Sequence, residues 1–440
     1  MVLKVELLSK EMMMKPSSPT PPHLKTFKLS FLDQISPPCF IPLIFFFHDA
    51  AANGEDDHRV CSSQLLKQSL SKVLTLFYPL AGRIKGNDFI DCSDDGALWV
   101  EARVHGFLKD VVENPLMEEL EKFLPKTSDD SELMLGVQVN YFLDGGIAIG
   151  VWVSHKIADA LSLVNFVNAW AVIAREGDAA AGKISPPNFG LMSSLFPPTT
   201  MDLSGSGFSP TFGMTREKIV TKRVVFDKEK LAALKKSAAA ESSGVGNPTR
   251  VEALSAFMWK NFREASRKKS QDTSMKKTIR ATHNVNLRAR MKPPLPEATF
   301  GNLWSPVNTT ESPCPDDDDL VFQLRTSIRE INAEYVEALQ NEKGQSEHLR
   351  KWHERFTGEV EAEFMDFSSW CRFPIYEVDF GWGRPVWACP PAFPYKNFIV
   401  FMSTKCGDGI EAWINIGEED DDIYMGAGSL TPMPKLQCYQ

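Results

Sequence analysis

The chain has 440 residues, of which 43% are hydrophobic and 24% are charged, and its formal net charge is −9. This length allows two or three globular domains, each large enough for a core of its own. The negative charge disfavours nucleic acids and anionic membranes as general partners, because a surface of the same sign repels them.

Cysteine usage and the N-terminal segment give an expectation for the cellular compartment. The eight cysteines are dispersed and none forms a C-x-x-C pair, which favours reduced thiols over a disulfide framework or a structural zinc site. Charged residues interrupt the N-terminal segment, so it does not resemble a signal peptide. The most apolar run, residues 40–47, is too short to span a bilayer and predicts a buried strand. We therefore expect a cytoplasmic protein.

In the first half of the chain, helix and strand patterns alternate. A β-rich segment precedes the proline-rich loop at residues 16–22. Apolar residues at helical spacing predict a helix from about Val60 to Leu76, and residues 89–100 predict a strand pair. The apolar run 146–153 predicts a further strand. Helical spacing after residue 160 then predicts a helix that ends near Gly177.

The second half continues this mixed pattern after a change of composition. Residues 178–218 are rich in Gly, Ser, Pro, Met and Ala without a sustained period. They predict a crossover between a domain at 1–205 and a domain at 219–440, although an ordered loop packed on both halves is an alternative. Further predicted elements are a helix over 228–239 capped by Asp227, a helix to about residue 267 opened by the capping box of Thr249 and Glu252, helices over 320–339 and 346–365, and strands at 397–402 and 409–416.

Several common catalytic motifs are missing from the sequence. It contains no P-loop pattern G-x-x-x-x-G-K-[ST], no nucleophile elbow G-x-S-x-G and no metalloprotease pattern H-E-x-x-H. The pair Gly244-x-Gly246 lacks a third glycine and follows a predicted helix, so it gives no support to a dinucleotide-binding fold.

His155 and Asp159 are the most informative polar pair. They lie where the predicted strand 146–153 passes into the predicted helix, a position from which catalytic side chains are often presented. A neutral imidazole accepts a proton near pH 7, because its reference pKa is about 6.5. However, a histidine near a strand end is more often a satisfied polar residue than a catalyst. The spacing H-x-x-x-D is therefore weak evidence by itself.

A second motif strengthens the evidence that His155 and Asp159 are functional. The segment Asp379-Phe-Gly-Trp-Gly383 follows more than two hundred residues later, and its glycines specify a tight loop. In order, spacing and chain length, the two motifs resemble the plant BAHD acyltransferases. The similarity spans nearly the whole chain, and the sequence around His155 is most similar to the branch of alkaloid acetyltransferases. Further matching segments are Leu29–Asp33, Phe77–Arg83, Arg288 and Phe300–Asn302.

The resemblance implies an α/β fold of two chloramphenicol-acetyltransferase-like domains with mixed sheets and a channel at their interface. It implies acyl transfer from acyl-CoA, acetyl-CoA in the first place, to a hydroxyl of a small plant metabolite, with an alkaloid favoured. Acyl-CoA is then a co-substrate, without a permanently bound cofactor or metal, and the protein is expected to be a monomer. The alternatives are a malonyl or other donor, an esterase or acyl-CoA hydrolase on the same fold, and a non-catalytic binding protein.

The same resemblance assigns roles to residues. His155 is the general base, whereas Asp159 pairs with Arg288 and braces the histidine loop, although its spacing also fits a carboxylate that orients the imidazole.

For Asp379 two roles are open: a second proton acceptor, or a residue with a structural or cofactor-gating role. We favour the second. Asn302 and Trp382 are candidates for stabilising the oxyanion or for contacting the cofactor.

Overall fold

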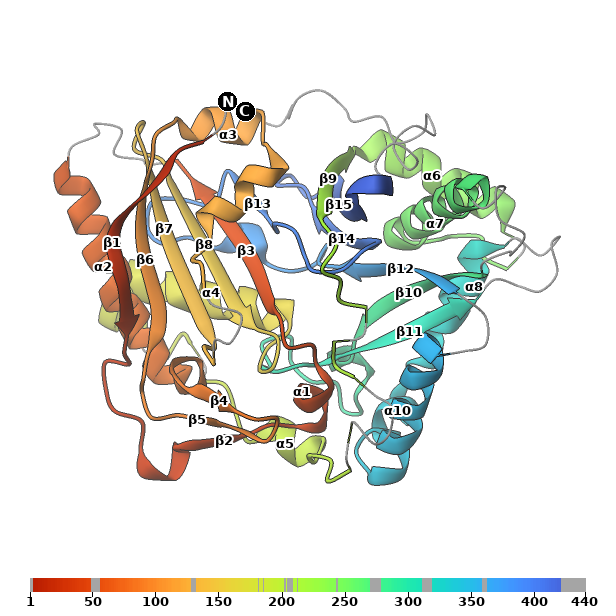
Figure 1. The fold of residues 1–440 in the computed structure, drawn as a ribbon, viewed down its shortest axis with the longest axis horizontal. Coiled ribbons are helices and arrows are strands. Elements are labelled where there is room, and N and C mark those ends of the chain that lie inside the picture. The colour runs from red at the N-terminus through yellow and green to blue at the C-terminus, as the bar shows by residue number, and fades with distance from the viewer. Residues whose placement is uncertain are drawn as a thin grey trace. The chain divides into compact units, whose positions relative to one another are not determined.

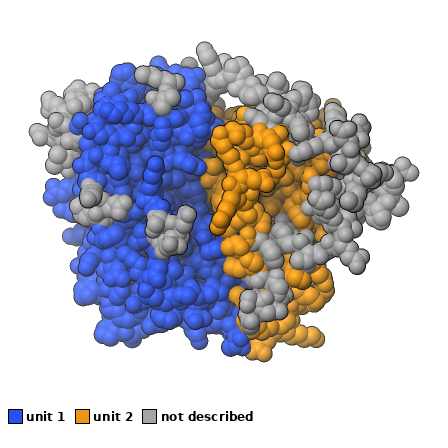
Figure 2. Space-filling view, in the orientation of Figure 1, with its two compact units in different colours: residues 1–200, 296–302, 373–391 blue, residues 201–295, 303–372, 392–440 orange. Residues whose placement is uncertain are grey.

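The structure is a computed structural model, and residue contacts divide the chain into two compact units (Figure 2). Unit 1 comprises residues 1–200, 296–302 and 373–391, and unit 2 comprises residues 201–295, 303–372 and 392–440. Among the described residues, no helix is both long and apolar enough to cross a membrane. The structure describes residues 3–48, 56–127, 132–180, 182–184, 186–201, 203, 209–211, 213–242, 244–269, 278–310, 319–357 and 362–420.

Unit 1 is built on a mixed sheet that has, within the described residues, six strands in the order β1-β6-β7-β8-β3-β13 (Figure 1). Strands β6 and β7 run parallel, and the other neighbours are antiparallel. Every residue of β7 and β8 is buried, so both faces of these strands are covered, and the sequence of β8 is almost continuously apolar. The strands predicted at 40–47 and 146–153 are confirmed. The bounds are β1 Val5–Met14, β3 Phe40–Phe47, β6 Ala97–Val104, β7 Leu135–Phe142, β8 Ile147–Ser154 and β13 Trp387–Cys389.

Two long helices, α2 (Asp56–Leu76) and α4 (Ala160–Glu176), pack against each other on this sheet. Trp170 of α4 joins the layers: its ring meets Trp99 of β6 edge-on at 6.3 Å, and its Nε1–H donates to Ser69 Oγ of α2 at 2.9 Å. Both helices appear where the sequence predicts them. The shorter elements are a small sheet of β2 Thr26–Lys28, β4 Arg83–Lys85 and β5 Phe89–Asp91, the helices α1 Phe31–Ile35, α3 Leu108–Glu113 and α5 Leu191–Leu195, and the 3₁₀ turns Pro22–Leu24, Tyr78–Ala81, Met117–Phe123, Gly177–Ala180 and Ile375–Glu377.

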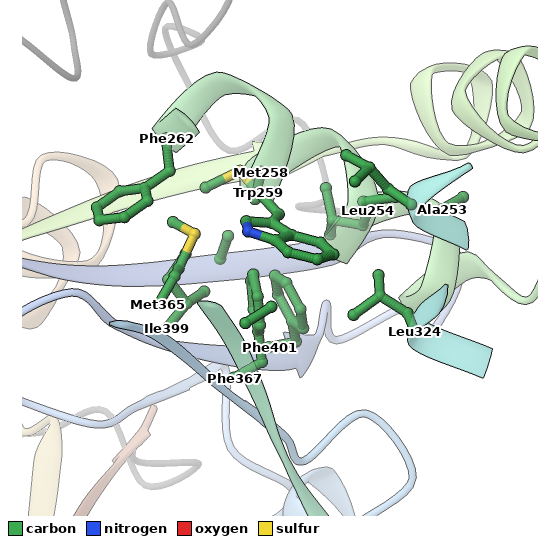
Figure 3. Close-up of a cluster of buried hydrophobic side chains, with 14 of the residues drawn as sticks. Ala253, Leu254, Met258, Trp259, Phe262, Leu324, Met365, Phe367, Ile399 and Phe401 are labelled. Carbon is green, nitrogen blue, oxygen red and sulfur yellow. The ribbon is translucent and has the colours of Figure 1, made fainter. Parts of the chain in front are cut away.

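Unit 2 contains a second mixed sheet of six described strands, in the order β11-β10-β12-β14-β15-β9. Here β12 lies parallel to both β10 and β14. Figure 3 shows Trp259 of α7 pointing toward Phe367 and Phe401 of the sheet, with Leu324 of α8 closing one side of this core. The bounds are β9 Ile219–Phe226, β10 Thr278–Asn286, β11 Trp304–Thr310, β12 Ala362–Ser369, β14 Phe398–Ser403, β15 Ile410–Gly417, α6 Lys228–Glu241, α7 Arg250–Lys269, α8 Leu320–Glu330, α9 Ala333–Ala338, α10 Glu342–Thr357 and the 3₁₀ turns Arg288–Arg290 and Glu418–Asp420.

The helix caps predicted in unit 2 are present. Asp227 accepts a hydrogen bond from the Lys230 N–H at 2.8 Å. Thr249 and Glu252 cap each other, with the Thr249 N–H donating to the Glu252 carboxylate and the Glu252 N–H donating to Thr249 Oγ1. These short-range interactions explain why both helix starts are correct.

Two helix predictions in unit 2 are wrong in extent. The helix expected over 320–339 is divided into α8 and α9, because Asn332 caps a new helix by accepting from the Tyr335 N–H at 2.9 Å. The helix expected over 346–365 ends at Thr357, and β12 begins at Ala362. In that strand Met365 and Phe367 alternate into the core, a period of two that the helical pattern masked.

The division into units differs from a single cut of the chain. The change at residue 200 falls inside the predicted crossover 178–218, part of which lies outside the described residues. However, residues 296–302 and 373–391, expected in the C-terminal domain, belong to unit 1. For the second segment the reason is β13, which pairs with β3 and extends the sheet of unit 1.

Candidate functional site

His155 directly follows β8, in the interior of the unit 1 sheet. The last residue of β8, Ser154, pairs with Phe40 of β3, and the His155 N–H donates to the Cys39 carbonyl at 2.8 Å. The ladder therefore continues one residue beyond the strand and fixes the backbone from which the imidazole projects. The chain then turns, and α4 begins at Ala160. His155 thus occupies the strand-to-helix junction that the sequence predicts.

Asp159 is the N-cap of α4. Its Oδ1 accepts from the Ser162 N–H at 2.8 Å, and its own N–H donates to the Gly301 carbonyl at 3.3 Å. An N-cap of this kind typically contributes about 1 kcal/mol to helix stability. The carboxylate therefore stabilises the start of the helix that follows His155, which is a positioning role.

Asn302 lies against His155 and determines its tautomer. The Asn302 Nδ2 group donates to the His155 carbonyl at 2.7 Å and to Asp33 Oδ1 at 2.9 Å. Because both partners are acceptors, the NH₂ end of the amide must face them, and Oδ1 faces His155 Nδ1 at 3.0 Å. A carbonyl oxygen can only accept, so Nδ1 carries the proton and Nε2 carries the lone pair.

This arrangement corrects one role predicted for Asn302. An oxyanion donor needs an N–H directed at the reacting oxygen. Both hydrogens of the Asn302 amide are directed at Asp33 and at the His155 carbonyl. Asn302 therefore orients the histidine and is not placed to stabilise an oxyanion.

The segment that carries Asn302 is attached to the first turn of α4. Ser162 Oγ donates to the Gly301 carbonyl and accepts from the Gly301 N–H, both at 3.0 Å. Gly301 has a φ of 139°, and a Cβ there would lie 2.8 Å from the Met192 side chain. Only glycine fits this position without strain. Phe300 completes the attachment by packing edge-on against Phe77 with ring centroids 5.6 Å apart.

The protein environment keeps the imidazole neutral. Desolvation lowers the pKa of His155 below its usual value, whereas the charge of Asp159 and the hydrogen bond to Asn302 oppose that shift in part. At neutral pH the group is therefore a base with an available lone pair, rather than an imidazolium.

Two buried ionisable residues, Asp33 and Lys156, lie next to His155 and Asn302. The sequence did not single out either of them as functional. Burial raises the pKa of Asp33 to about 6 and lowers the pKa of Lys156 to about 8. Lys156 Nζ donates to the carbonyls of Gln34 at 2.9 Å and Ser36 at 3.0 Å. The signal for Asp33 was the Ser30-x-x-Asp33 spacing, which forms a complete capping box at the start of α1.

Asp379 and Trp382 lie at the far end of the same sheet from His155. Trp382 packs edge-on against Phe47, at the opposite end of β3 from Phe40, and seven strand residues span roughly 20 Å. The Arg175 guanidinium, in the last turn of α4, donates to the backbone carbonyl of Asp379. His155, in contrast, precedes the first turn of α4. The fifteen residues between the two ends of α4 also span roughly 20 Å.

This separation corrects two further roles. Asp379 is too distant to accept a proton from a substrate held at His155, and Trp382 is too distant to stabilise an oxyanion there. Asp379 Oδ1 instead accepts from the N–H groups of Gly381 at 2.8 Å and Gly383 at 3.0 Å. Both glycines have positive φ, 111° and 101°. Asp379 therefore holds the shape of its own loop.

Arg288 lies in unit 2, at the start of a 3₁₀ turn, and is buried. Asn286 Oδ1 accepts from its backbone N–H at 3.0 Å and from its guanidinium at 3.3 Å. The pairing of Arg288 with Asp159 stays a prediction.

The electrostatics of the site give a measurable expectation. We expect the pKa of His155 to lie below 6.5, because the desolvated imidazolium is less stable than in water. Titration of the histidine Cε1–H signals by NMR measures this, with the His155 signal assigned from its loss in His155→Gln. A midpoint at or above 6.5 contradicts the environment described above.

Comparisons with known proteins identify the family of the chain. The model of the Transferase family matches residues 3–421. Stemmadenine O-acetyltransferase from Catharanthus roseus is 41% identical over 96% of both chains, and vinorine synthase from Rauvolfia serpentina is 39% identical over 96% of both chains. The crystal structure of vinorine synthase superposes with a TM-score of 0.80 over 96% of each chain, at 36% identity.

The family match and these relatives each cover nearly the whole chain. The resemblance noted in the sequence is thereby confirmed, and the chain belongs to the Transferase family, the BAHD acyltransferases.

Proposed function

We propose that this protein transfers an acetyl group from acetyl-CoA to a hydroxyl of a plant specialised metabolite, with His155 as the general base. The observation that carries the proposal is the orientation of the imidazole by Asn302. With the proton on Nδ1, the lone pair of the neutral ring is on Nε2, where it can receive the proton of an alcohol.

The reaction follows from this geometry without an acyl-enzyme. Nε2 removes the hydroxyl proton as the alcohol oxygen attacks the thioester carbonyl, because a neutral hydroxyl is a poor nucleophile. The tetrahedral intermediate then collapses, the carbon–sulfur bond breaks, and the imidazolium returns the proton to the departing thiolate. Asn302 accepts from Nδ1–H throughout and stabilises the positive ring. A positioned general base of this kind typically contributes about 10²–10⁴-fold to the rate.

The relatives support acetyl as the acyl group and an alkaloid as the acceptor. Stemmadenine O-acetyltransferase and salutaridinol 7-O-acetyltransferase, the latter 35% identical, carry an O-acetyl transfer in their names. Members of the family use an acyl-CoA as co-substrate. The segment Thr299–Leu303 also departs from the Tyr-Phe-Gly-Asn-Cys pattern expected of malonyl transfer to flavonoid glycosides. The monomeric state and the cytoplasmic location stay predictions.

Two carboxylates, one at each end of α4, have supporting roles in this proposal. Asp159 caps α4 and, by its predicted pairing with Arg288, braces the histidine loop. Asp379 shapes the loop that it begins, together with Arg175 at the end of α4. Neither carboxylate exchanges a proton with the substrate.

Replacement of His155 by alanine tests the base assignment. We expect a loss of kcat of about 10²–10⁴-fold, because the alcohol loses its proton acceptor. The Km for acetyl-CoA and the unfolding transition should change little. Release of free thiol from acetyl-CoA and mass spectrometry of products from an extract of the source tissue measure transfer. Full transfer by the variant would falsify the assignment, and thiol release without an alcohol acceptor would favour a hydrolase instead.

A pair of substitutions separates the structural role of Asp379 from a chemical one. Asp379→Asn keeps an oxygen for the two glycine N–H groups, so its activity should stay within about threefold of wild type. Asp379→Ala loses both hydrogen bonds, each worth about 1 kcal/mol, and should unfold at a lower temperature. Calorimetry and steady-state kinetics measure these effects. A stable Asp379→Asn variant as inactive as His155→Ala would make Asp379 a chemical participant.

The predicted pairing of Asp159 with Arg288 is tested by a double-mutant cycle. Asp159→Asn, Arg288→Gln and the double variant are compared in chemical unfolding and in kcat/KM. A direct ion pair should give a coupling free energy of about 0.5–3 kcal/mol. Additive effects of the two substitutions would show that Asp159 and Arg288 do not interact, and the proposed pairing would be wrong.

A further inference from the structure

We propose that Asp33 is a positioning residue for His155 and acts through Asn302, so that the hydrogen-bonded chain Asp33–Asn302–His155 determines which imidazole nitrogen receives the substrate proton. The inference rests on the proposed function in one respect, since it takes His155 as the base. Its structural content, the tautomer of His155, is independent of any activity.

Each atom of the Asp33 carboxylate has a separate set of donors. Asp33 is fully buried, and its Oδ2 accepts from the Ser30 N–H at 2.9 Å and from Ser30 Oγ at 2.7 Å. Its Oδ1 faces Asn302 Nδ2 at 2.9 Å. Oδ2 of Asp33 therefore caps α1, whereas Oδ1 accepts from Asn302, which lies 269 positions later in the chain.

A carboxylate at this place prevents the Asn302 amide from turning over. If the amide rotated by half a turn, its oxygen would face Asp33 Oδ1 and the His155 carbonyl, two acceptors without a proton to share. Its NH₂ group would then face Nδ1 of His155. A buried polar group that loses its hydrogen bond costs about 1–3 kcal/mol. Asp33 thus holds the amide oxygen toward Nδ1 and favours the tautomer with a lone pair on Nε2.

The charge of Asp33 has a second effect on the imidazole. A negative charge at the end of the chain stabilises the imidazolium that forms as the alcohol loses its proton, and the intervening amide transmits this polarisation. Other ionisable groups also shift these pKa values. Lys156 lowers the pKa of Asp33 and of His155, whereas Asp159 raises the pKa of His155. Cys39 raises the pKa of Lys156. Lys156 Nζ is directed at the carbonyls of Gln34 and Ser36.

The simpler explanation is that Asp33 serves the capping box of α1 alone. Ser30 provides a matched control for this, because Ser30→Ala removes the hydroxyl that bonds Oδ2 while the contact of Oδ1 with Asn302 stays intact. Asp33→Asn is the complementary variant. An amide at position 33 cannot accept from both Ser30 and Asn302 with the same pattern, so it permits Asn302 to turn over.

The experiment measures the tautomer of His155 and the kinetics in the same proteins. Long-range ¹H–¹⁵N NMR of histidine-labelled protein should show the Nδ1–H tautomer for His155 in wild type and Ser30→Ala, and a shift toward Nε2–H in Asp33→Asn. With acetyl-CoA and an alcohol that the wild-type protein acetylates, Asp33→Asn should lose kcat by about 10²-fold. Its Km for acetyl-CoA should be nearly unchanged. Ser30→Ala should stay within about twofold.

The pH profile adds a readout that a purely structural residue does not move. In wild type the acid limb of kcat/KM contains the protonation of Asp33, whose pKa is raised to about 6, as well as the protonation of His155. Asp33→Asn lacks the first of these two steps. The acid limb of kcat/KM in Asp33→Asn should therefore lie at lower pH than in wild type, below a reduced plateau. A profile that falls uniformly without displacement contradicts the proposal.

The outcomes separate this inference from the proposed function. An Nε2–H tautomer in wild type, an unchanged tautomer in Asp33→Asn, or an equal loss of kcat in Ser30→Ala overturns the role of Asp33. A changed tautomer in Asp33→Asn with full transfer by His155→Ala supports the chain and overturns the base assignment. If Asp33→Asn does not fold, Asp33→Ser takes its place in the experiment, because serine retains a small acceptor for the cap. The same results then support or overturn the proposal.

Discussion

The hydrogen bond between His155 Nδ1 and Asn302 Oδ1 is the interaction on which the proposed chemistry of this protein depends. A histidine at the end of a strand has two tautomers of similar free energy, and only the Nδ1–H form presents a lone pair on Nε2. The amide of Asn302 makes the choice because its two hydrogens are directed at the His155 carbonyl and at Asp33. The proposed proton acceptor is thus defined by an arrangement of three residues, none of which specifies it alone.

The architecture of unit 1 supplies the rigidity that this arrangement requires. His155 is fixed by the ladder of β8 and β3, and the segment of Asn302 is fixed by Ser162 on the first turn of α4. Asp159 caps the same turn. The strand, the helix start and the attached segment therefore determine one another's positions. A shift of a few tenths of an ångström in any of them would lengthen the bond at Nδ1 and weaken the preference for one tautomer.

Local patterns in the sequence predicted most of the fold. The buried strand at 40–47, the caps at Asp227 and Thr249, and the helix after His155 follow from periodicity and from interactions over three or four residues. The division of α8 from α9 was missed because one capping asparagine outweighs a continuing helical pattern. His155 was singled out because its motif lies at an element boundary and because the second motif, at residues 379–383, strengthens the family resemblance.

The part of the site that sequence could not predict consists of contacts between distant segments. Asn302 meets His155 across 147 residues and Asp33 across 269, and no local pattern encodes those pairings. Motif similarity drew Asp379 and Trp382 toward the chemistry, whereas the register of β3 with β8 separates them from His155 by roughly the length of a strand. A motif that identifies a family can therefore specify a distant loop. The residues proposed to tune the base, Asp33 and Asn302, lie in two other segments that match the family, and the sequence does not show that they meet. The opposite displacements of the pKa values of His155 and Asp33 have the same origin, since burial disfavours the charged form of each group. Desolvation keeps the imidazole neutral and able to accept a proton. Ser30, Asn302 and Lys156 stabilise the charge of the carboxylate, which is ionised above a pH of about 6.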